Sequence, residues 1–259
     1  MASIEGRATP AMVDSPRNRA WIFEPELEHE IALYCFPPAG GGAATYRLWQ
    51  RTLPSAVGVY RFQPPGRENR FREPFCSSFE DYVAAAASLI AERGNRPFAL
   101  FGHSMGAVVA YETARAVREL TGREPMHLFV SAFRSPRTPH AEPIHELPDA
   151  ELVAELQRRY DGIPAQVLAN PEVLELTLPI VRSDLALLHS YTYRPGAIPG
   201  CPLTAIGGSD DPWVSPAELE DWRHFTTGPF ATHRLPGGHF YLAPQAEALL
   251  RIVEQALLP

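Results

Sequence analysis

"RPFALFGHSMGAVVAYETAR", residues 96–115, joins an apolar run to an alanine-rich run through a short turn that holds Ser104 between two glycines. The apolar run has the pattern of a buried strand, and the second run has that of an amphipathic helix. Gly102 and Gly106 lack a Cβ, so the chain can turn tightly on both sides of the serine. The stretch therefore matches a G-x-S-x-G nucleophile elbow, which exposes a serine at the carboxyl edge of a parallel sheet. A glycine-flanked helix cap without a chemical role is the alternative.

Apolar runs that close in glycine or proline turns recur along the chain and predict buried parallel strands. They occupy residues 31–36, 57–62, 98–101 and 127–133, followed much later by PLTAIGG (202–208) and HRLPGGHFYL (233–242). Helix patterns lie between them: one capped by Ser78 that ends at Gly94, one from the elbow to about Leu120, and a last one over about 244–258. This alternation predicts an α/β fold, with a mainly parallel sheet and helices on both of its faces.

The stretch 135–199 departs from this alternation, because it holds helix patterns and no strand pattern. DAELVAELQRRY (149–160) and PEVLELTLPIVRSDLALLHSYTY (171–193) are its helical parts. It is predicted to be a helical insertion at about 135–199 within a single domain that spans 21–259. An insertion directly after a strand of an α/β sheet is well placed to form a lid over the active-site loops. A packing elaboration without a gating role is the alternative.

Composition narrows the class of protein. The 259 residues are 45% hydrophobic, enough for one large core, yet no apolar stretch approaches the roughly 20 residues that span a bilayer, so no membrane segment is expected. The net charge of -7 and the scattered arginines argue against nucleic-acid binding. Three widely spaced cysteines suggest neither a metal site nor a disulfide framework. A reducing, cytoplasmic setting and a monomer are therefore expected.

We do not expect residues 1–20 to belong to the folded domain. The N-terminus lacks the basic and apolar regions of a secretory signal. MASIEGRATPAM (1–12) contains Ile4-Glu5-Gly6-Arg7, which resembles a factor Xa recognition sequence in an expression tag. We expect the natural chain to begin near Met12 and residues 1–20 to be a tag and a disordered N-terminus.

A serine nucleophile needs a histidine to accept its proton and an acid to orient that histidine. Both follow later predicted strands in the order acid, then histidine: Asp210 and Asp211 in AIGGSDDPWV, and His239 in LPGGHFYL. Asp211 completes a G-x-x-D-x-x-V pattern that is usual in the acid loops of α/β-hydrolases, so it is preferred over Asp210. Ser104, Asp211 and His239 are thus the predicted catalytic triad, and the other histidines are expected to lie on the surface or in the packing.

An acyl-enzyme route also needs two donors for the oxyanion. The backbone N–H of Met105, directly after the nucleophile, is one candidate. The second is predicted in YCFPPAGGGAATYRLW (34–49), where Ala39 and the glycines behind it can bring backbone N–H groups close to a ligand. A phosphate-binding glycine loop is the alternative, but the segment has neither G-x-G-x-x-G nor a P-loop lysine.

Taken together, six segments resemble type II thioesterases, the free-standing α/β-hydrolases that serve polyketide, nonribosomal peptide and fatty acid synthases. They are FPPAGGGAATY (36–46), PPGRENRFREP (64–74), FGHSMGA (101–107), VRSDLALLHSYTY (181–193), GGSDDPWV (207–214) and LPGGHFYL (235–242). Pro64, directly before Pro65-Gly66-Arg67, stands where the family would have leucine. The resemblance implies an α/β-hydrolase fold with a lid and no cofactor or metal of its own. The implied substrate is an acyl thioester on the phosphopantetheine arm of a carrier protein, the implied partner.

Several alternatives stay open at this point. A carboxylesterase or an acyltransferase would use the same triad, and a binding module on a hydrolase scaffold would not use it. The charged segment 64–74 is expected to be a solvated surface loop that either contacts the carrier or braces the fold through Arg–Glu pairs.

Overall fold

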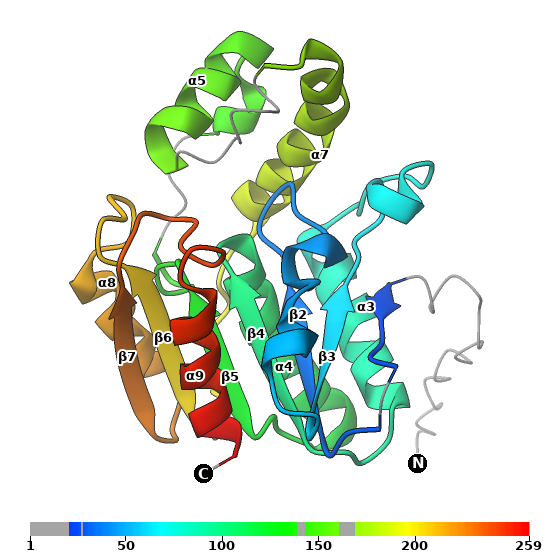
Figure 1. The fold of residues 1–259 in the computed structure, drawn as a ribbon, viewed down its shortest axis with the longest axis vertical. Coiled ribbons are helices and arrows are strands. Elements are labelled where there is room, and N and C mark those ends of the chain that lie inside the picture. Colours follow the sequence, from blue (N-terminus) through cyan, green and yellow to red (C-terminus); the bar gives the residue numbers. More distant parts are fainter. Residues whose placement is uncertain (1–20, 27, 139–142, 161–168, 259) are drawn as a thin grey trace, which may run out of the picture.

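The computed structural model describes residues 21–26, 28–138, 143–160 and 169–258, and at their centre lies a seven-stranded sheet (Figure 1). The strands follow the order β1-β3-β2-β4-β5-β6-β7 across the sheet. Only β1, at the edge beside β3, runs antiparallel to its neighbour. The strands are β1 (Ile22–Phe23), β2 (Ile31–Phe36), β3 (Val57–Phe62), β4 (Phe98–His103), β5 (His127–Ser131), β6 (Leu203–Gly208) and β7 (Phe230–Leu235).

The central strands are apolar on both faces because helices cover both faces. In β2, Tyr34 and Phe36 belong to one buried cluster, and Leu33 and Cys35 belong to the cluster on the other side of the sheet. Helices α3 (Phe79–Glu92), α4 (Met105–Thr121) and α8 (Pro216–Glu220) supply the first cluster; α2 (Trp49–Thr52) and α9 (Ala246–Leu257) supply the second. Four 3-10 turns complete the order: η1 (Ala43–Tyr46), η2 (Glu68–Arg70), η3 (Ile144–Glu146) and η4 (Asp221–Phe225). The predicted α/β class is confirmed.

Two helices stand over the carboxyl ends of the strands (Figure 1). They are α5 (Asp149–Tyr160) and α7 (Pro171–Ser190), and with η3 they have a small core of their own around Leu152, Leu156 and Leu178. Within 135–199, the residues that the structure describes contain these helices and no strand, as the sequence pattern predicts. A gating role for this cap stays a prediction.

Several element boundaries differ from the sequence prediction. Strand β4 continues to His103, and β5 ends at Ser131 because Ala132 has a φ of 51°, which an extended strand does not allow. Helix α9 begins at Ala246 rather than at 244. The two-residue strand β1 is too short to produce a sequence pattern.

The predicted tag and disordered N-terminus, residues 1–20, lie outside the described residues. Among the described helices, none combines the length and the apolar composition that a membrane crossing requires.

Candidate active site

Ser104 occupies the turn between β4 and α4 in a backbone conformation that few residues adopt, with φ 54° and ψ -124°. A Cβ on Gly102 would lie 1.9 Å from the carbonyl oxygen of Gly106, and one on Gly106 would lie 2.2 Å from that of Phe36. Real Cβ contacts essentially never fall below 3.0 Å. Glycine is therefore required at both positions, and the tight turn lifts Ser104 to the carboxyl edge of the sheet.

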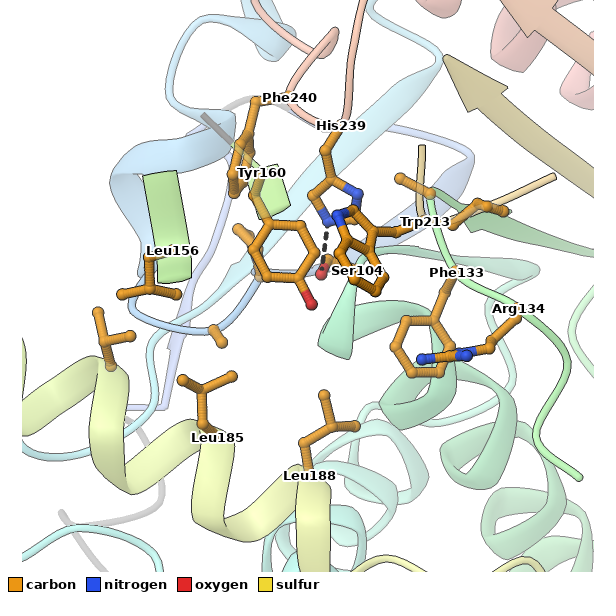
Figure 2. Close-up of a pocket in the computed structure, with 15 residues that line it drawn as sticks. Ser104, Phe133, Arg134, Leu156, Tyr160, Leu185, Leu188, Trp213, His239 and Phe240 are labelled. Carbon is orange, nitrogen blue, oxygen red and sulfur yellow. Dashed lines mark hydrogen bonds between the residues drawn. The ribbon is translucent and has the colours of Figure 1, made fainter. Parts of the chain in front are cut away.

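His239 lies between Ser104 and Asp211. Its Nε2 is 3.0 Å from Ser104 Oγ, and its Nδ1 is 2.8 Å from Asp211 Oδ2 (Figure 2 draws the first of these contacts). Because a carboxylate only accepts hydrogen bonds, Nδ1 carries the proton and Nε2 is left to accept the hydroxyl hydrogen of Ser104. The loops after β4, β6 and β7 thus bring together three side chains that lie far apart in the sequence.

The two neighbouring aspartates have different environments. Asp211 is buried, and its Oδ1 accepts a hydrogen bond of 2.9 Å from the amide of Trp213, which fixes the carboxylate toward His239. Asp210 is exposed, and its backbone amide donates to the carbonyl of Gly237 at 2.9 Å. Asp211, which the sequence pattern favours, is the one beside His239.

A second histidine, His103, packs against His239, with ring centroids 5.5 Å apart. Its Nδ1 lies 2.8 Å from Ser131 Oγ, and Ser131 Oγ lies 2.5 Å from the hydroxyl of Tyr241. Burial lowers the pKa of His103 well below its ordinary value, so this ring stays neutral. A neutral neighbour does not oppose a positive charge on His239.

The two predicted oxyanion donors are a residue adjacent to Ser104 and a residue that lines the same cavity as Ser104. Met105 is the first residue of α4, and Ala39 lines the same cavity as Ser104. Neither amide hydrogen-bonds to another residue in the described part of the chain. Both donors are therefore available to a ligand, and the positive end of the α4 helix dipole adds to the field at the serine.

A cavity of about 720 Å³, counted out to its open mouth, lies beside Ser104 and His239 (Figure 2). Its described wall is mostly apolar and aromatic, with residues from four loops and both cap helices: Pro38, Ala39, Ala132, Phe133, Arg134, Leu156, Tyr160, Val181, Leu185, Leu188, Trp213, Val214 and Phe240. The ring of Tyr160 lies against that of His239 at a tilt of 45°, with ring centroids 4.7 Å apart. Arg134 is the one permanently charged side chain among these wall residues. The cavity suits a mainly apolar group attached at the serine.

The expectation that the charged segment 64–74 is a solvated loop is wrong for two of its arginines. Arg67 and Arg70 are 3% and 4% exposed. Arg70 pairs with Glu73 at 2.6 Å, as an Arg–Glu brace requires, but Arg67 pairs with Asp184 of α7 instead. A charged sequence does not reveal such burial when the partner lies 117 positions away.

Sequence reasoning missed the cavity residues of α5 and α7. The helical pattern was visible, but the direction in which Leu156, Tyr160 and Leu185 face depends on how the two helices pack. Leu156 belongs to the small core of the cap, and Tyr160 and Leu185 pack against it, so the apolar pattern of the helices does not by itself reveal which residues also line the cavity.

Comparison with known proteins gives consistent matches across the chain. A family model described as a thioesterase domain matches residues 32–257. The thioesterase PikA5 of Streptomyces venezuelae is 36% identical over 255 residues, which cover 95% of this chain and 90% of that protein. The solved structure of the type II thioesterase BorB from the borrelidin biosynthetic cluster superposes with a TM-score of 0.84 at 37% identity, covering 92% of this chain and 98% of that one.

A further relative is the linear gramicidin dehydrogenase LgrE of Brevibacillus parabrevis, 42% identical over 243 residues and covering 92% of both chains. Its name refers to a dehydrogenase, but the present sequence lacks the G-x-G-x-x-G motif of dinucleotide-binding proteins. The likeness to BorB identifies the fold of this chain as that of the α/β-hydrolases with a helical cap.

Proposed function

The chain belongs to the thioesterase domain family, and on that premise we propose its reaction. It hydrolyses thioesters between acyl groups and the phosphopantetheine arm of acyl or peptidyl carrier proteins in polyketide or nonribosomal peptide biosynthesis, removing stalled or aberrant groups. The observation that carries the proposal is the hydrogen-bonded series of Asp211, His239 and Ser104, which opens on an apolar cavity.

Acylation starts with attack of Ser104 Oγ on the thioester carbonyl carbon while His239 Nε2 accepts the hydroxyl proton. The carbonyl oxygen becomes negative and takes hydrogen bonds from the amides of Met105 and Ala39. The C–S bond then breaks, and the sulfur takes the proton that His239 accepted from Ser104, which leaves the histidine neutral for the second half of the reaction. A thiol of pKa about 8.5 is a good leaving group, so the triad and two amides suffice.

Deacylation repeats the same steps with water. His239 accepts a proton from water, the water oxygen bonds to the acyl carbon, and the bond to Ser104 Oγ breaks as His239 returns the proton to the serine. Asp211 keeps the imidazole in the required tautomer and stabilises its positive charge in both halves. The proposed reaction needs no cofactor or metal ion, because every proton and electron pair is supplied by the triad, the substrate and water.

The carrier protein as partner is supported by relatives. BorB is a type II thioesterase from a biosynthetic cluster, and PikA5 is a thioesterase. We place the enzyme in the cytoplasm, in keeping with three free cysteines. We take it to be a monomer. A carboxylesterase or an acyltransferase remains the alternative. The same triad can attack oxoesters, and it can pass the acyl group to an alcohol or amine in place of water.

The test compares substrates of one acyl group. Wild type and a Ser104→Ala variant are incubated with an acyl-loaded carrier protein, a free acyl thioester and a p-nitrophenyl oxoester, and deacylation is followed by mass and absorbance. We expect wild type to release the carrier-bound group fastest and Ser104→Ala to release none. Rapid cleavage of the oxoester with the carrier left loaded would favour the carboxylesterase.

A further inference from the structure

Arg67 and Asp184 form an ion pair inside the protein. Arg67 comes from segment 64–74, and Asp184 comes from segment 181–193. Arg67 Nη2 lies 2.7 Å from Asp184 Oδ1, and Nη1 lies 2.5 Å from Oδ2. The two side chains are 3% and 2% exposed. A buried ion pair contributes little net stability compared with an apolar pair of the same size, so stability alone does not account for it.

Both members of the pair also bind the loop that carries the predicted oxyanion donor Ala39. The amide of Gly40 donates to Asp184 Oδ2 at 2.8 Å, and Arg67 Nη1 donates to the carbonyl oxygen of Gly41 at 2.9 Å. The peptide bond between residues 39 and 40 and the one between residues 41 and 42 are thus held by charged groups. Because Ala39 immediately precedes Gly40, the direction of its amide depends on the same anchor.

Helix α7 touches the loop at a second point. A Cβ on Gly40 would lie 2.6 Å from Val181 Cγ2, one turn of α7 before Asp184, and Gly40 has a φ of 78°. The helix therefore lies directly against the backbone of the loop. Figure 1 shows the lower end of α7 beside the loop that follows β2.

We propose that Arg67 and Asp184 are positioning residues, which hold the Ala39 amide in place for the oxyanion and couple the oxyanion site to cap helix α7. The proposal rests on the proposed function and adds to it a physical link between the cap and the chemistry. Asp184 supplies the acceptor that turns the Gly40 amide away from the cavity, and Arg67 neutralises and orients that carboxylate. Displacement of α7 from the core would release the loop and remove one oxyanion donor.

The test replaces the pair by apolar residues, because loss of one partner alone would leave a buried, unpaired charge. The double variant Arg67→Met, Asp184→Leu keeps the volume and removes both anchors. The matched control is Arg182→Met, Asp149→Leu. It removes another ion pair of α7 (2.6 Å), which joins α7 to the first residue of α5 and does not involve the loop after β2. The single variant Asp184→Asn retains an oxygen that can accept from Gly40 but leaves the buried Arg67 guanidinium without a carboxylate partner, so it separates the ion pair from the hydrogen bond to Gly40.

We expect the double variant to lose about 10- to 100-fold in kcat on an acyl thioester, with KM changed by less than about threefold. A trifluoromethyl ketone analogue, whose adduct with Ser104 places an oxyanion in the same site, should lose affinity by a similar factor. An unreactive thioether analogue should bind as before. The control should keep its kcat, and Asp184→Asn should lie between the double variant and wild type.

A folded double variant with the kcat of wild type, or one that loses kcat but binds the trifluoromethyl ketone unchanged, would overturn the proposal while the proposed function stands. Absence of thioesterase activity in wild type would remove the proposed function instead. The anchoring of the loop is then tested by hydrogen exchange. The backbone amides of residues 39–42 should exchange faster in the double variant and in Asp184→Asn than in wild type. Unchanged exchange there would contradict it.

Discussion

At the scale of single residues, the adjacent aspartates 210 and 211 show how one position separates a buried acid from a surface residue. Asp211 binds His239 and the amide of Trp213, whereas Asp210 faces solvent. A sequence read without structure leaves the two nearly equivalent, because both follow the same predicted strand. The G-x-x-D-x-x-V pattern favours Asp211 since it encodes the turn that directs this side chain inward.

Asp211→Asn should lower kcat by about 10³- to 10⁴-fold, because an amide can hold the wrong histidine tautomer and cannot stabilise the imidazolium. Asp210→Asn is the matched control and should change kcat by less than about twofold. Steady-state hydrolysis of one acyl thioester by both variants decides the question, and a larger loss in Asp210→Asn would reverse the assignment of the acid.

At the scale of elements, the elbow was predictable because everything that defines it lies within a few residues. The strand pattern, the two glycines and the helix pattern occur together in residues 96–115. The carbonyl of Phe36, which makes glycine necessary at position 106, comes from the neighbouring strand β2 and lies outside that local pattern.

Gly106→Ala should lower the free energy of unfolding by more than about 3 kcal/mol, because the new Cβ meets backbone that has no room to move. Gly94→Ala is the comparison: no atom lies within 4 Å of its Cβ, and only its φ of 73° is unfavourable, which costs about 1 to 2 kcal/mol. Urea unfolding of both variants measures the difference. Equal losses would show that the close approach at Gly106 has been overestimated.

The cap helices were predictable as helices but not as cavity walls. Leu185 of α7 lines the cavity, while Leu176 of the same helix is 54% exposed. Leu185→Phe should therefore shift the preferred substrate toward shorter acyl chains, since the larger ring occupies space in the cavity. Leu176→Phe should leave the preference unchanged. Values of kcat/KM across a series of acyl chain lengths test this, and a shift in both variants would place the acyl chain elsewhere.

At the scale of the whole molecule, the mainly parallel sheet and the acid-before-histidine arrangement followed from the sequence, because strand ends in an α/β sheet gather at one edge. The contact between Arg67 and Asp184 did not follow. It joins the loop after β3 to a helix of the cap 117 positions away, and neither segment alone indicates that the two side chains meet. Pairings across such distances depend on the packing of the complete chain.

The three cysteines belong to this scale, because their surroundings lower their reactivity: Cys35 and Cys201 are buried, and Cys76 is partly buried. Burial raises the pKa of Cys76 and of Cys201 to about 12, and it raises that of Cys35 well above its ordinary value. Since the thiolate is the reactive form, we expect iodoacetamide at pH 8 to leave the activity of the native protein intact. Three thiols should react after denaturation, and a fluorophosphonate should abolish activity. Rapid inactivation by iodoacetamide would contradict this account.

An acyl group bound to Ser104 would be visible in the mass of the enzyme itself during turnover. Wild type mixed with an acyl-loaded carrier protein is quenched within milliseconds, and the peptide that contains Ser104 is analysed by mass spectrometry. The account predicts that this peptide gains the mass of the acyl group at Ser104 and that a Ser104→Ala variant gains none and leaves the carrier loaded. Release of the acyl group by Ser104→Ala at the rate of wild type would contradict it.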